Sequence, residues 1–541
     1  MKFVITYLVG MALLALFSHK ASAQAPELLW GRVVADGGHG DAARVRVDRE
    51  GNVYISGNFV STLKVGDVTL QSVGMEDVFL AKFDQNGEFQ WVHSFGSQLI
   101  DWGSAAAIGE GGRIYFGFNL LGPAAVRADT LTSGGLVLGL DEDGRILWVH
   151  QPQSLSGNKV AMAVSDLVVD SQGAVYLSGE VIGEADFGPF SIKSTGGREL
   201  HSDALLVKYS ADGIPEWGIR YGGPHEDDIG STLGIDAEGN IYVLAFVDGN
   251  FDGVSTPCEL PPTSSAPFLG KVDPDGNPQW GLCIVHDDPT TVWAYDLATD
   301  ASANSFVAGV FNGRFGTDSA WVLPDIDARA SLAKFDRDGN LVWAISDGGL
   351  NTYVEVDNLG RIHVLNWNSS TRERSFVGYD QLGQQLYSKL YPRRGGDLAA
   401  SADGSSLYSF GIVGKSVVID GQEFVGSGDW DALLAKFDLS GVPVSSEQVE
   451  ILGDEIAPMR NYPNPFNSST SVTFTLSDVS RVDLRVYDVM GREVVTLADG
   501  TYWAGRHTVT WSAAEQLPGG IYIAKLLVNG EHAQSQPIVR L

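Results

Sequence analysis

Two short runs of polar side chains contain residue types that bind hard cations. His225 to Asp228 follows a glycine pair, and His286 to Asp288 lies one repeat further along the chain. Calcium prefers oxygen ligands such as carboxylates, so a cation site is one reading of these runs. Asp41 and Asp101 occupy corresponding places in other repeats. That recurrence favours a turn or cap over a metal site.

The Asp-x-x-Gly segments have a partial likeness to calcium loops. Such loops space their acidic ligands as Asp-x-Asp-x-Asp-Gly, and only 141–144 and 336–339 come near that spacing. An Asp carboxylate that caps backbone amides, followed by a glycine with positive φ, closes a hairpin without an ion. We therefore expect turns at these positions and no metal ligands.

Local catalytic motifs are absent from the sequence. It contains no GxSxG elbow, no HExxH pair and no glycine-rich phosphate loop, and its 10 histidines are scattered. A Ser-His-Asp triad can still be assembled from residues that are distant in sequence. The sequence thus predicts no catalytic residue and no cofactor, while a hydrolase remains an alternative.

Composition and charge indicate an all-β protein that avoids anionic partners. The 541 residues include 65 glycines, which suit many tight turns better than helices. The net charge is -31, with 67 acidic against 36 basic residues. Such a chain repels phosphate backbones and anionic lipid surfaces, so nucleic acid is excluded as a partner.

The N-terminus has the features of a secretory signal peptide. Lys2 is followed by an apolar run from Val4 to Phe17, and Ala21 and Ala23 form an A-x-A cleavage pattern. We expect cleavage after Ala23, which makes 1–23 the signal peptide. No later stretch is long and apolar enough to span a bilayer, so the mature chain should have no transmembrane span.

Export also bears on the two cysteines, Cys258 and Cys283. An oxidising compartment favours a disulfide between them. Two buried thiols are the alternative.

A first repeated pattern consists of an alternating apolar run, a turn and a second strand. Its clearest copy is 47–57, and it returns at 109–117, 169–179, 235–244, 299–309, 356–365 and 401–411. The alternation has the period of two that is typical of half-buried strands. Seven copies therefore predict seven equivalent strand pairs.

A second pattern, a strand, an Asp-x-x-Gly turn and an aromatic, alternates with the first. The expected structural aromatics are Trp30, Trp91, Trp148, Trp217, Trp280, Trp343 and Tyr387. A period near 60 residues with four strands is typical of propeller blades. We predict a seven-bladed β-propeller over 24–450, in which 28–34 supplies the outer strand of the last blade and closes the ring.

These patterns resemble the bacterial propeller repeats called SBBP repeats. The best matches are Asp-Ala-Leu-Leu-Ala-Lys-Phe-Asp at 431–438 and Asp-Ala-Leu-Leu-Val-Lys-Tyr-Ser at 203–210. The resemblance implies a fold and an extracellular setting, but no single activity. The short sixth repeat and the degraded turns of the second and sixth depart from the family pattern.

The last 83 residues, 459–541, follow a linker at 451–458 and predict a small immunoglobulin-like β-sandwich. The motif residues are Asn461, Pro463, Asn464, Pro465, Phe466, Asn467, Gly491, Gly520 and Tyr522. In this order, with Arg540 near the end, they resemble the type A sorting domain of type IX secretion. The resemblance implies passage through the outer membrane by way of the secretion machinery. An ordinary module without a sorting role is the alternative.

The sequence as a whole predicts a secreted or surface-attached binding or adhesion scaffold with an extracellular polysaccharide or protein ligand. One alternative is a hydrolase or lyase that acts on polysaccharide or peptide in the central funnel, and another is a structural surface-layer component. Convergence of His, Asp or Arg at the axis would favour the enzyme, whereas an aromatic-lined or uniformly acidic face would favour binding.

Overall fold

The computed structural model divides the chain into two compact units, Met1–Ser446 and Glu447–Leu541. The structure describes residues 25–36, 42–126, 129–156, 161–195, 202–223, 228–247, 250–251, 266–286, 292–312, 315–317, 320–322, 329–345, 350–368, 373–391, 394–426, 428, 431–444, 459–462, 466, 469–476, 480–488, 491–502, 505–512 and 517–540. The predicted signal peptide and the predicted linker at 451–458 lie outside these ranges.

The first unit is built from antiparallel sheets whose strands follow one another along the chain. The first four sheets contain β2 (Ala42–Val47), β3 (Val53–Phe59), β6 (Asp77–Phe83) and β7 (Phe89–Phe95); β8 (Trp102–Ile108), β9 (Ile114–Leu120), β12 (Gly134–Leu140) and β13 (Ile146–His150); β15 (Met162–Val169), β16 (Val175–Ile182), β19 (Ser202–Tyr209) and β20 (Pro215–Gly222); β21 (Ile229–Ile235), β22 (Ile241–Val247), β24 (Ala266–Val272) and β25 (Pro278–Cys283).

The same order continues in the second half of this unit. Its sheets contain β27 (Val292–Thr299), β28 (Ser305–Asn312), β31 (Arg329–Phe335) and β32 (Leu341–Ile345); β33 (Leu350–Val356), β34 (Ile362–Asn368), β35 (Glu373–Tyr379) and β36 (Gln385–Tyr391); β37 (Arg394–Ala400), β38 (Ser406–Ile412), β41 (Ala432–Asp438) and β1 (Glu27–Asp36). A short 3-10 helix, Glu110–Gly112, lies between β8 and β9.

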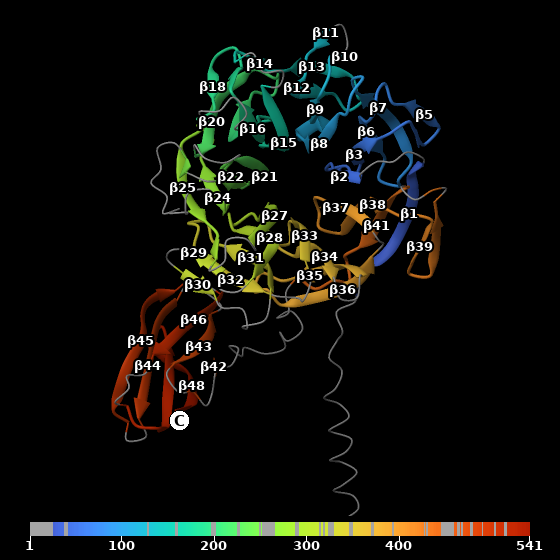
Figure 1. The fold of residues 1–541 in the computed structure, drawn as a ribbon. Helices are drawn as coiled ribbons and strands as arrows, with labels where there is room; N and C mark the ends of the chain where they lie inside the picture. Colours follow the sequence, from blue (N-terminus) through green and yellow to red (C-terminus); the bar gives the residue numbers. More distant parts are fainter. Residues whose placement is uncertain are drawn as a thin grey trace, which may run out of the picture. The chain divides into compact units, whose positions relative to one another are not determined.

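The first strands of these sheets form a ring. Each contacts the first strand of the next sheet in the order β2, β8, β15, β21, β27, β33 and β37, and β37 contacts β2. Figure 1 shows these strands around the centre, with the later strands of each sheet further out. The unit therefore has a β-propeller-like fold.

The strand predicted at 28–34 to pair with the last repeat is β1. It pairs antiparallel with β41, for example Leu28 with Phe437 and Val33 with Leu433. The N-terminal segment thus completes a sheet whose other strands come from 394–438, because its backbone groups satisfy the outer edge of β41.

Short hairpins and small sheets occur between the strands of the larger sheets. They involve β4 (Thr62–Val65) and β5 (Val68–Gln71); β10 (Ala124–Val126) and β11 (Asp129–Leu131); β17 (Glu184–Asp186) and β18 (Ser191–Lys193), which join β14 (Gln153–Ser154); β29 (Phe315–Thr317) and β30 (Ala320–Val322), which join β26 (Val285–His286); and β39 (Ser416–Ile419) and β40 (Gln422–Val425). β4 pairs with β1, and β23 (Asn250–Phe251) pairs with β20. These two pairings cover part of the outer edges of β1 and β20.

The repeated turns have the chemistry that the sequence predicts for them. In the turn between β2 and β3, Asp48 Oδ1 accepts a hydrogen bond from the Asn52 amide at 2.7 Å. Gly51 adopts a φ of 85°, a conformation that side chains with a Cβ rarely tolerate. The carboxylate and the glycine together close the hairpin. In the turn at 300–303 the same position is taken by Ala303, which has a φ of 66°.

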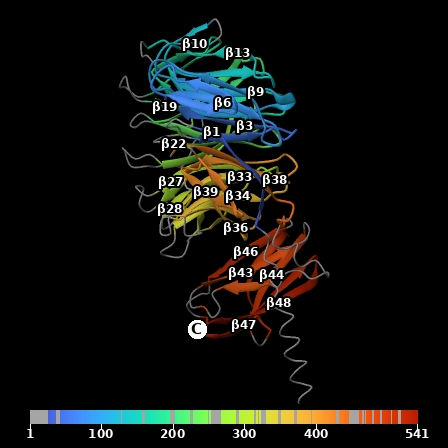
Figure 2. The same cartoon turned by 90° about the vertical axis from the view of Figure 1, so that its right-hand side faces the viewer.

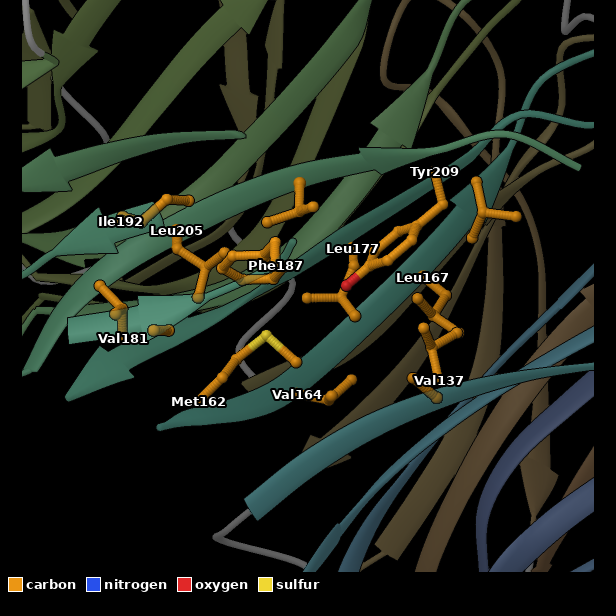
Figure 3. Close-up of a cluster of buried hydrophobic side chains, with 14 of the residues drawn as sticks. Val137, Met162, Val164, Leu167, Leu177, Val181, Phe187, Ile192, Leu205 and Tyr209 are labelled. Carbon is orange, nitrogen blue, oxygen red and sulfur yellow. The ribbon is translucent and has the colours of Figure 1, made fainter. Parts of the chain in front are cut away.

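Apolar side chains fill the spaces between neighbouring sheets. One such cluster joins Val137 of β12 to Met162, Leu177 and Tyr209 of the next sheet, all of them buried (Figure 3). Burying a side chain of this size is worth about 1.5 to 3 kcal/mol. The sheets are held together by such interfaces, so the ring is a rigid frame for the side chains at its centre.

The second unit, in red in Figure 2, contains two sheets, and these sheets share one hydrophobic core. The sheets are β42 (Arg460–Tyr462), β43 (Ser469–Leu476) and β46 (Gly505–Ser512), and β45 (Glu493–Tyr502), β44 (Ser480–Asp488), β47 (Gly520–Val528) and β48 (Glu531–Arg540). Phe474 of one sheet and Leu484 of the other are both buried in that core. The alternating strands of the sequence thus place their apolar faces toward each other.

Candidate functional site

The first strand of each sheet has a β-bulge at a corresponding place, a feature that re-aims side chains. The residue four positions before the following turn lies at or just after the bulge. We call this set the central ring; its members are Arg44, Ala105, Asp166, Thr232, Asp296, Tyr353 and Asp397. Polar side chains from sheets far apart in sequence therefore meet at the centre of the unit.

Three carboxylates of the central ring connect neighbouring sheets. Asp166 Oδ2 accepts a hydrogen bond from the Leu233 amide at 3.0 Å, and Asp296 Oδ2 accepts one from the Val354 amide at 2.9 Å. Asp397 Oδ2 accepts from the amide of Val45 at 2.9 Å. In each case the donor is the residue after the ring member of the next sheet, so the three contacts are equivalent.

Thr232 links two of these carboxylates. Its Oγ1 lies 3.0 Å from Asp166 Oδ2 and 3.2 Å from Asp296 Oδ1. A hydroxyl carries a single proton, so it can donate to only one of the two at a time. Proton sharing at this position therefore depends on the ionisation of Asp296.

Arg44 supplies positive charge to the central ring. Its guanidinium lies 5.8 Å from the centroid of the Tyr353 ring. Asp166 and Asp397 raise the Arg44 pKa, against the lowering effect of burial. Arg44 Nε and Asp166 Oδ1 are buried atoms that have no hydrogen-bond partner among the described residues. The ring thus contains one donor and one acceptor that the described protein does not use.

A second pair of charges lies two residues further along the strands. Arg46 donates from Nη1 to Asp397 Oδ2 at 2.8 Å, and Glu355 Oε1 accepts from the Ala400 amide at 3.2 Å. Burial raises the Glu355 pKa to about 7, opposed by that hydrogen bond and by Arg46. Burial likewise raises the Asp296 pKa to about 7, opposed by Arg44. Both carboxyls therefore titrate near neutral pH.

Exposed apolar side chains lie at the start of three first strands. Trp102, Ile229 and Trp293 are 38%, 43% and 54% exposed, and each stands three residues before the central ring member of its own strand. Trp293 packs against Phe246 at a centroid distance of 5.6 Å, and Tyr295 is 41% exposed. We call the three aromatic members, Trp102, Trp293 and Tyr295, the aromatic rim.

The tryptophans that the sequence singled out lie between neighbouring sheets. In five of them the indole Nε1 donates to a carbonyl in the turn of the next sheet: Trp91 to Glu142 at 3.2 Å, Trp148 to Ala211 at 3.0 Å, Trp217 to Pro274 at 3.2 Å, Trp280 to Arg337 at 3.1 Å and Trp343 to Gln381 at 3.1 Å. A Cβ on Gly213 would lie 2.3 Å from the Trp148 ring, so the indole requires glycine there. Trp30 packs in the same way on Gly87.

The sixth repeat makes this connection differently. The Tyr387 hydroxyl and His363 Nδ1 form a hydrogen bond of 2.7 Å. Arg361, which is buried, donates to the Asp357 carboxylate at 2.6 Å and to the carbonyl oxygens of Leu439 and Val442 at 2.9 and 3.0 Å. A guanidinium thereby joins the sheets where the repeat lacks tryptophan.

The acidic residues considered as metal ligands have structural partners where they are described. Asp101 accepts from the Leu121 amide at 3.0 Å, and Asp228 accepts from the Gly223 amide at 2.8 Å. In the two Asp-rich turns, Asp141 and Asp336 accept from backbone amides. No group of three or more potential metal ligands occurs within the described part of the chain.

Several of the other predicted residues fall outside the described ranges. These are Asp41, His225, Glu226, Asp227, Asp287, Asp288, Cys258, Pro463, Asn464, Pro465, Asn467, Ala21 and Ala23. Cys283 is disulfide-bonded, and Cys258 is the only other cysteine in the sequence.

Sequence reasoning missed the central ring and the aromatic rim. The signal that finds them is their offset from the turn. Each ring member stands four residues before the first turn residue, which is Asp48, Gly109, Asp170, Asp236, Asp300, Asp357 or Ser401. Trp102 and Trp293 stand seven residues before Gly109 and Asp300. Superposing the repeats on the turn residue would have aligned Arg44, Asp166, Asp296 and Asp397 in one column. Periodicity alone treats them as ordinary alternating positions.

In the second unit, the motif residues gather at one end of the shared core. Phe466 is buried, packs on Trp511 at a centroid distance of 5.2 Å, and its amide donates to the Val539 carbonyl at 2.9 Å. Tyr522 packs on Trp511 and donates to the Pro518 carbonyl at 2.6 Å. Arg540 donates to the carbonyl of Leu517. The last strand is thus held by the residues that make up the motif.

The remaining motif positions shape the turns and edges of this unit. Asn461 pairs with Val472 across β42 and β43. Gly491 has a φ of 78° and donates to the Asp488 carbonyl at 2.9 Å. Gly520 starts β47 opposite Arg540 of β48. Residues 460–540 match the family model for secretion system C-terminal sorting domains.

The matched domain indicates where the protein is located. A type IX sorting domain indicates a protein that is secreted or attached to the cell surface, and it implies interaction with the secretion machinery. Among the residues that the structure describes, no helix is long and apolar enough to cross a membrane.

Solved structures of low identity resemble the chain. The β-propeller domain of the Trilobed protease from Pyrococcus furiosus matches with a TM-score of 0.40 and 6% identity over 74% of this chain and 98% of that one. An acylaminoacyl peptidase from Pyrococcus horikoshii matches with a TM-score of 0.41 and 9% identity over 82% and 59%. A gluconolactonase from Xanthomonas campestris has a TM-score of 0.32 and 16% identity over 63% and 86%. No curated protein matches the sequence.

Proposed function

We propose that the protein is a non-catalytic binding or adhesion scaffold, exported by its signal peptide and the type IX secretion system. The observation that carries the proposal is the match of residues 460–540 to the secretion system sorting domains. The signal sequence at 1–23 supplies the first step, passage across the inner membrane. Residues 459–541, an immunoglobulin-like sandwich, direct the second.

In this proposal the first unit is a seven-bladed propeller of SBBP-type repeats. The ring of first strands and the pairing of β1 with β41 support it. Inter-sheet contacts of the kind made by Trp148 and Asp397 support a rigid ring. Rigid rings bind ligands through side chains and loops at one face, which makes the propeller the ligand-binding part.

Binding is favoured over catalysis by the way the central carboxylates are used. Asp166, Asp296 and Asp397 each hold a backbone amide of the next sheet. A catalytic carboxylate must instead be free to exchange a proton with a substrate in hydrogen-bond reach. The aromatic rim offers exposed contact area of the kind that dominates binding energies.

A secreted hydrolase or lyase is the second candidate, because the convergence of Arg44, Tyr353 and Asp296 at the centre is an arrangement that enzymes use. Asp296, with its pKa raised to about 7, is suited to general acid chemistry at neutral pH. Release of reducing ends from polysaccharides, or of amines from peptides, by the wild-type protein and its loss in Asp296→Asn would favour this candidate.

The sorting step is tested by comparing the full-length protein with a truncation that ends at Pro458, in a host that has the secretion system. We expect only the full-length form to reach the surface or the medium, with an intact mass that reports loss of the C-terminal domain. Equal export of both forms would show that 459–541 is an ordinary module.

A further inference from the structure

We propose that an exposed apolar surface on the loops of the first two sheets binds an apolar segment of a partner protein that is flanked by basic residues. The inference rests on the proposed binding function and names the class of partner. We call this surface the apolar loop surface. Its members are Val73, Met75, Leu99, Ile100, Trp102 and Leu121.

The members of the apolar loop surface lie on three segments that contact one another. The segments are 72–76, which precedes β6, 96–102, which joins β7 to β8, and 121–122, which follows β9. The Met75 amide donates to the Leu99 carbonyl at 3.2 Å, and Glu76 forms a bridge with Ile100. A Cβ on Gly122 would lie 3.6 Å from Leu99 Cδ1. The segments are thus neighbours although they come from two sheets.

Buried carboxylates hold these segments in place. Asp101 Oδ1 accepts hydrogen bonds from the Ser97 hydroxyl at 2.9 Å and from the Leu121 amide at 3.0 Å. Asp77 Oδ2 accepts one from the Val73 amide at 2.9 Å. Loops that are already fixed by such contacts lose little conformational freedom when a partner binds. The apolar loop surface is therefore pre-organised for binding.

The exposed apolar area is large enough to serve as a binding surface. Each of the six side chains is between 36% and 60% exposed. Together they amount to on the order of 500 Å², within the range of about 300 to 600 Å² at which the largest apolar patch of a monomer is often functional. Only two charged residues occur in 72–76, 96–102 and 121–122: Glu76, which is partly exposed, and Asp101, which is buried. Large apolar side chains with few charges are typical of the centre of a protein interface.

The residue types favour a polypeptide over a sugar. Sugar sites combine aromatic faces with polar side chains that bond the hydroxyl groups. Trp102 is the only aromatic member of the apolar loop surface, and the polar side chains of Ser97 and Asp101 bond to each other. Met75 is flexible, and such a side chain adapts its shape to the apolar side chains of a partner. The apolar loop surface therefore fits leucine-like side chains of a protein segment.

Charge favours a basic partner over a second copy of the chain. The net charge is -31, so the protein attracts basic residues that flank an apolar segment and repels both another copy and an anionic membrane. A stable interface between two copies also needs about 800 Å² from each partner, which is more than this surface offers. The partner that fits is a short segment with apolar side chains and flanking Lys or Arg.

The test measures the binding of three labelled peptides of about 12 residues to the purified exported protein by fluorescence anisotropy. The first peptide contains leucine and lysine, the second has serine in place of leucine, and the third has glutamate in place of lysine. We expect the first to bind at least about tenfold more tightly than either of the others, because it alone carries both apolar side chains and positive charge.

Met75→Ser and Leu99→Ser should each weaken binding of the leucine-lysine peptide by about tenfold and leave binding of the serine-lysine peptide unchanged. Met75→Leu should retain most of the affinity, since it keeps the apolar area. Ile214→Ser is the matched control, because Ile214 is 60% exposed, like Met75, and lies outside the apolar loop surface, between β19 and β20. The substituted side chains are all exposed, so thermal unfolding of these variants should match that of wild type.

Equal affinity for the leucine-lysine and serine-lysine peptides, binding of the leucine-glutamate peptide as tight as that of the leucine-lysine peptide, or wild-type affinity in both Met75→Ser and Leu99→Ser would overturn the inference. So would a dimer in sedimentation velocity, or binding to phosphatidylcholine vesicles, that the same substitutions abolish, because either result assigns the surface to another occupant. These outcomes leave the proposed export and scaffold role standing. The scaffold role fails separately, if the protein releases reducing ends or amines from a substrate.

Discussion

Asp397 and Val45 are 352 residues apart in sequence, yet the carboxylate Oδ2 of the first accepts a hydrogen bond from the backbone amide of the second at 2.9 Å. The same oxygen accepts from Arg46 at 2.8 Å. This contact joins the sheet of β37, β38, β41 and β1 to the sheet of β2, β3, β6 and β7. The stability of the ring should therefore depend on a single carboxylate at this position.

Asp397→Ala is expected to lower the free energy of unfolding by about 2 to 4 kcal/mol, because it leaves a buried amide and Arg46 without their acceptor. Asp397→Asn keeps one oxygen for Val45 and should cost about half as much. Denaturant unfolding followed by tryptophan fluorescence measures both. Asp143→Ala, at a largely exposed turn position, is the control and should change the stability by less than about 0.5 kcal/mol. Equal stability of wild type and Asp397→Ala would refute a role for this contact.

The raised pKa values of Asp296 and Glu355 predict a particular dependence of stability on pH. Both groups titrate at about 7 when folded, and near 4 when unfolded. Between these values the folded chain binds more protons than the unfolded chain, so their contribution to stability falls as pH rises from about 4 to 7 and is constant above.

Asp296→Asn removes one of these titrations and keeps an oxygen for the Val354 amide. Its stability relative to wild type should therefore improve with rising pH, by about 2 to 3 kcal/mol between pH 5 and 8. Thermal unfolding at a series of pH values measures the difference. A constant difference across that range would mean that Asp296 is ionised throughout.

The turns, the packing tryptophans and the pairing of β1 with β41 could be predicted from the sequence, but the contacts of the central ring could not. Turn residues such as Asp48 and Gly51 act over four positions, so local chemistry specifies them. Trp148 was recognisable as packing because it recurs at a fixed distance from a turn. Trp30 precedes the first complete repeat, and this position predicted that the N-terminal segment pairs with the last repeat, as β1 does with β41.

The central ring could not be read in the same way, because its contacts join residues about 60 positions apart through the packing of whole sheets. Asp166 binds an amide of the next sheet, and nothing in its own neighbourhood distinguishes it from a solvent-facing carboxylate. The sixth repeat presents the same difficulty. Loss of tryptophan at Tyr387 was visible, but not that Arg361 would take over the contact to Leu439 and Val442.

The tryptophans between the sheets provide a direct test of the packing role. Trp148 donates to Ala211 at 3.0 Å and lies against Gly213. Trp148→Ala should lower the free energy of unfolding by about 3 to 5 kcal/mol, since it opens a cavity between two sheets. Trp148→Phe keeps most of the ring and loses the hydrogen bond, for a cost of about 1 kcal/mol. Similar costs for the two variants in denaturant unfolding would contradict a packing role.

The sorting domain links stability to export. Phe466 is 1% exposed and packs on Trp511, and its amide holds the last strand through Val539. Phe466→Ala should cost about 3 to 5 kcal/mol, enough to unfold a unit of this size under ordinary conditions. Calorimetry of the purified protein should then show loss of one transition, with the transition of the first unit unchanged.

In the host that has the secretion system, the same variant should accumulate in the periplasm instead of reaching the surface or the medium. Ile521→Ala is the matched control, because Ile521 lies on β47 opposite Val539 and is 55% exposed. This variant should be exported like wild type. Cell fractionation with immunodetection of the first unit measures both. Export of Phe466→Ala at the wild-type level, with its C-terminal unit unfolded, would mean that the machinery reads a linear segment and that the folded arrangement around Trp511 is not part of the signal.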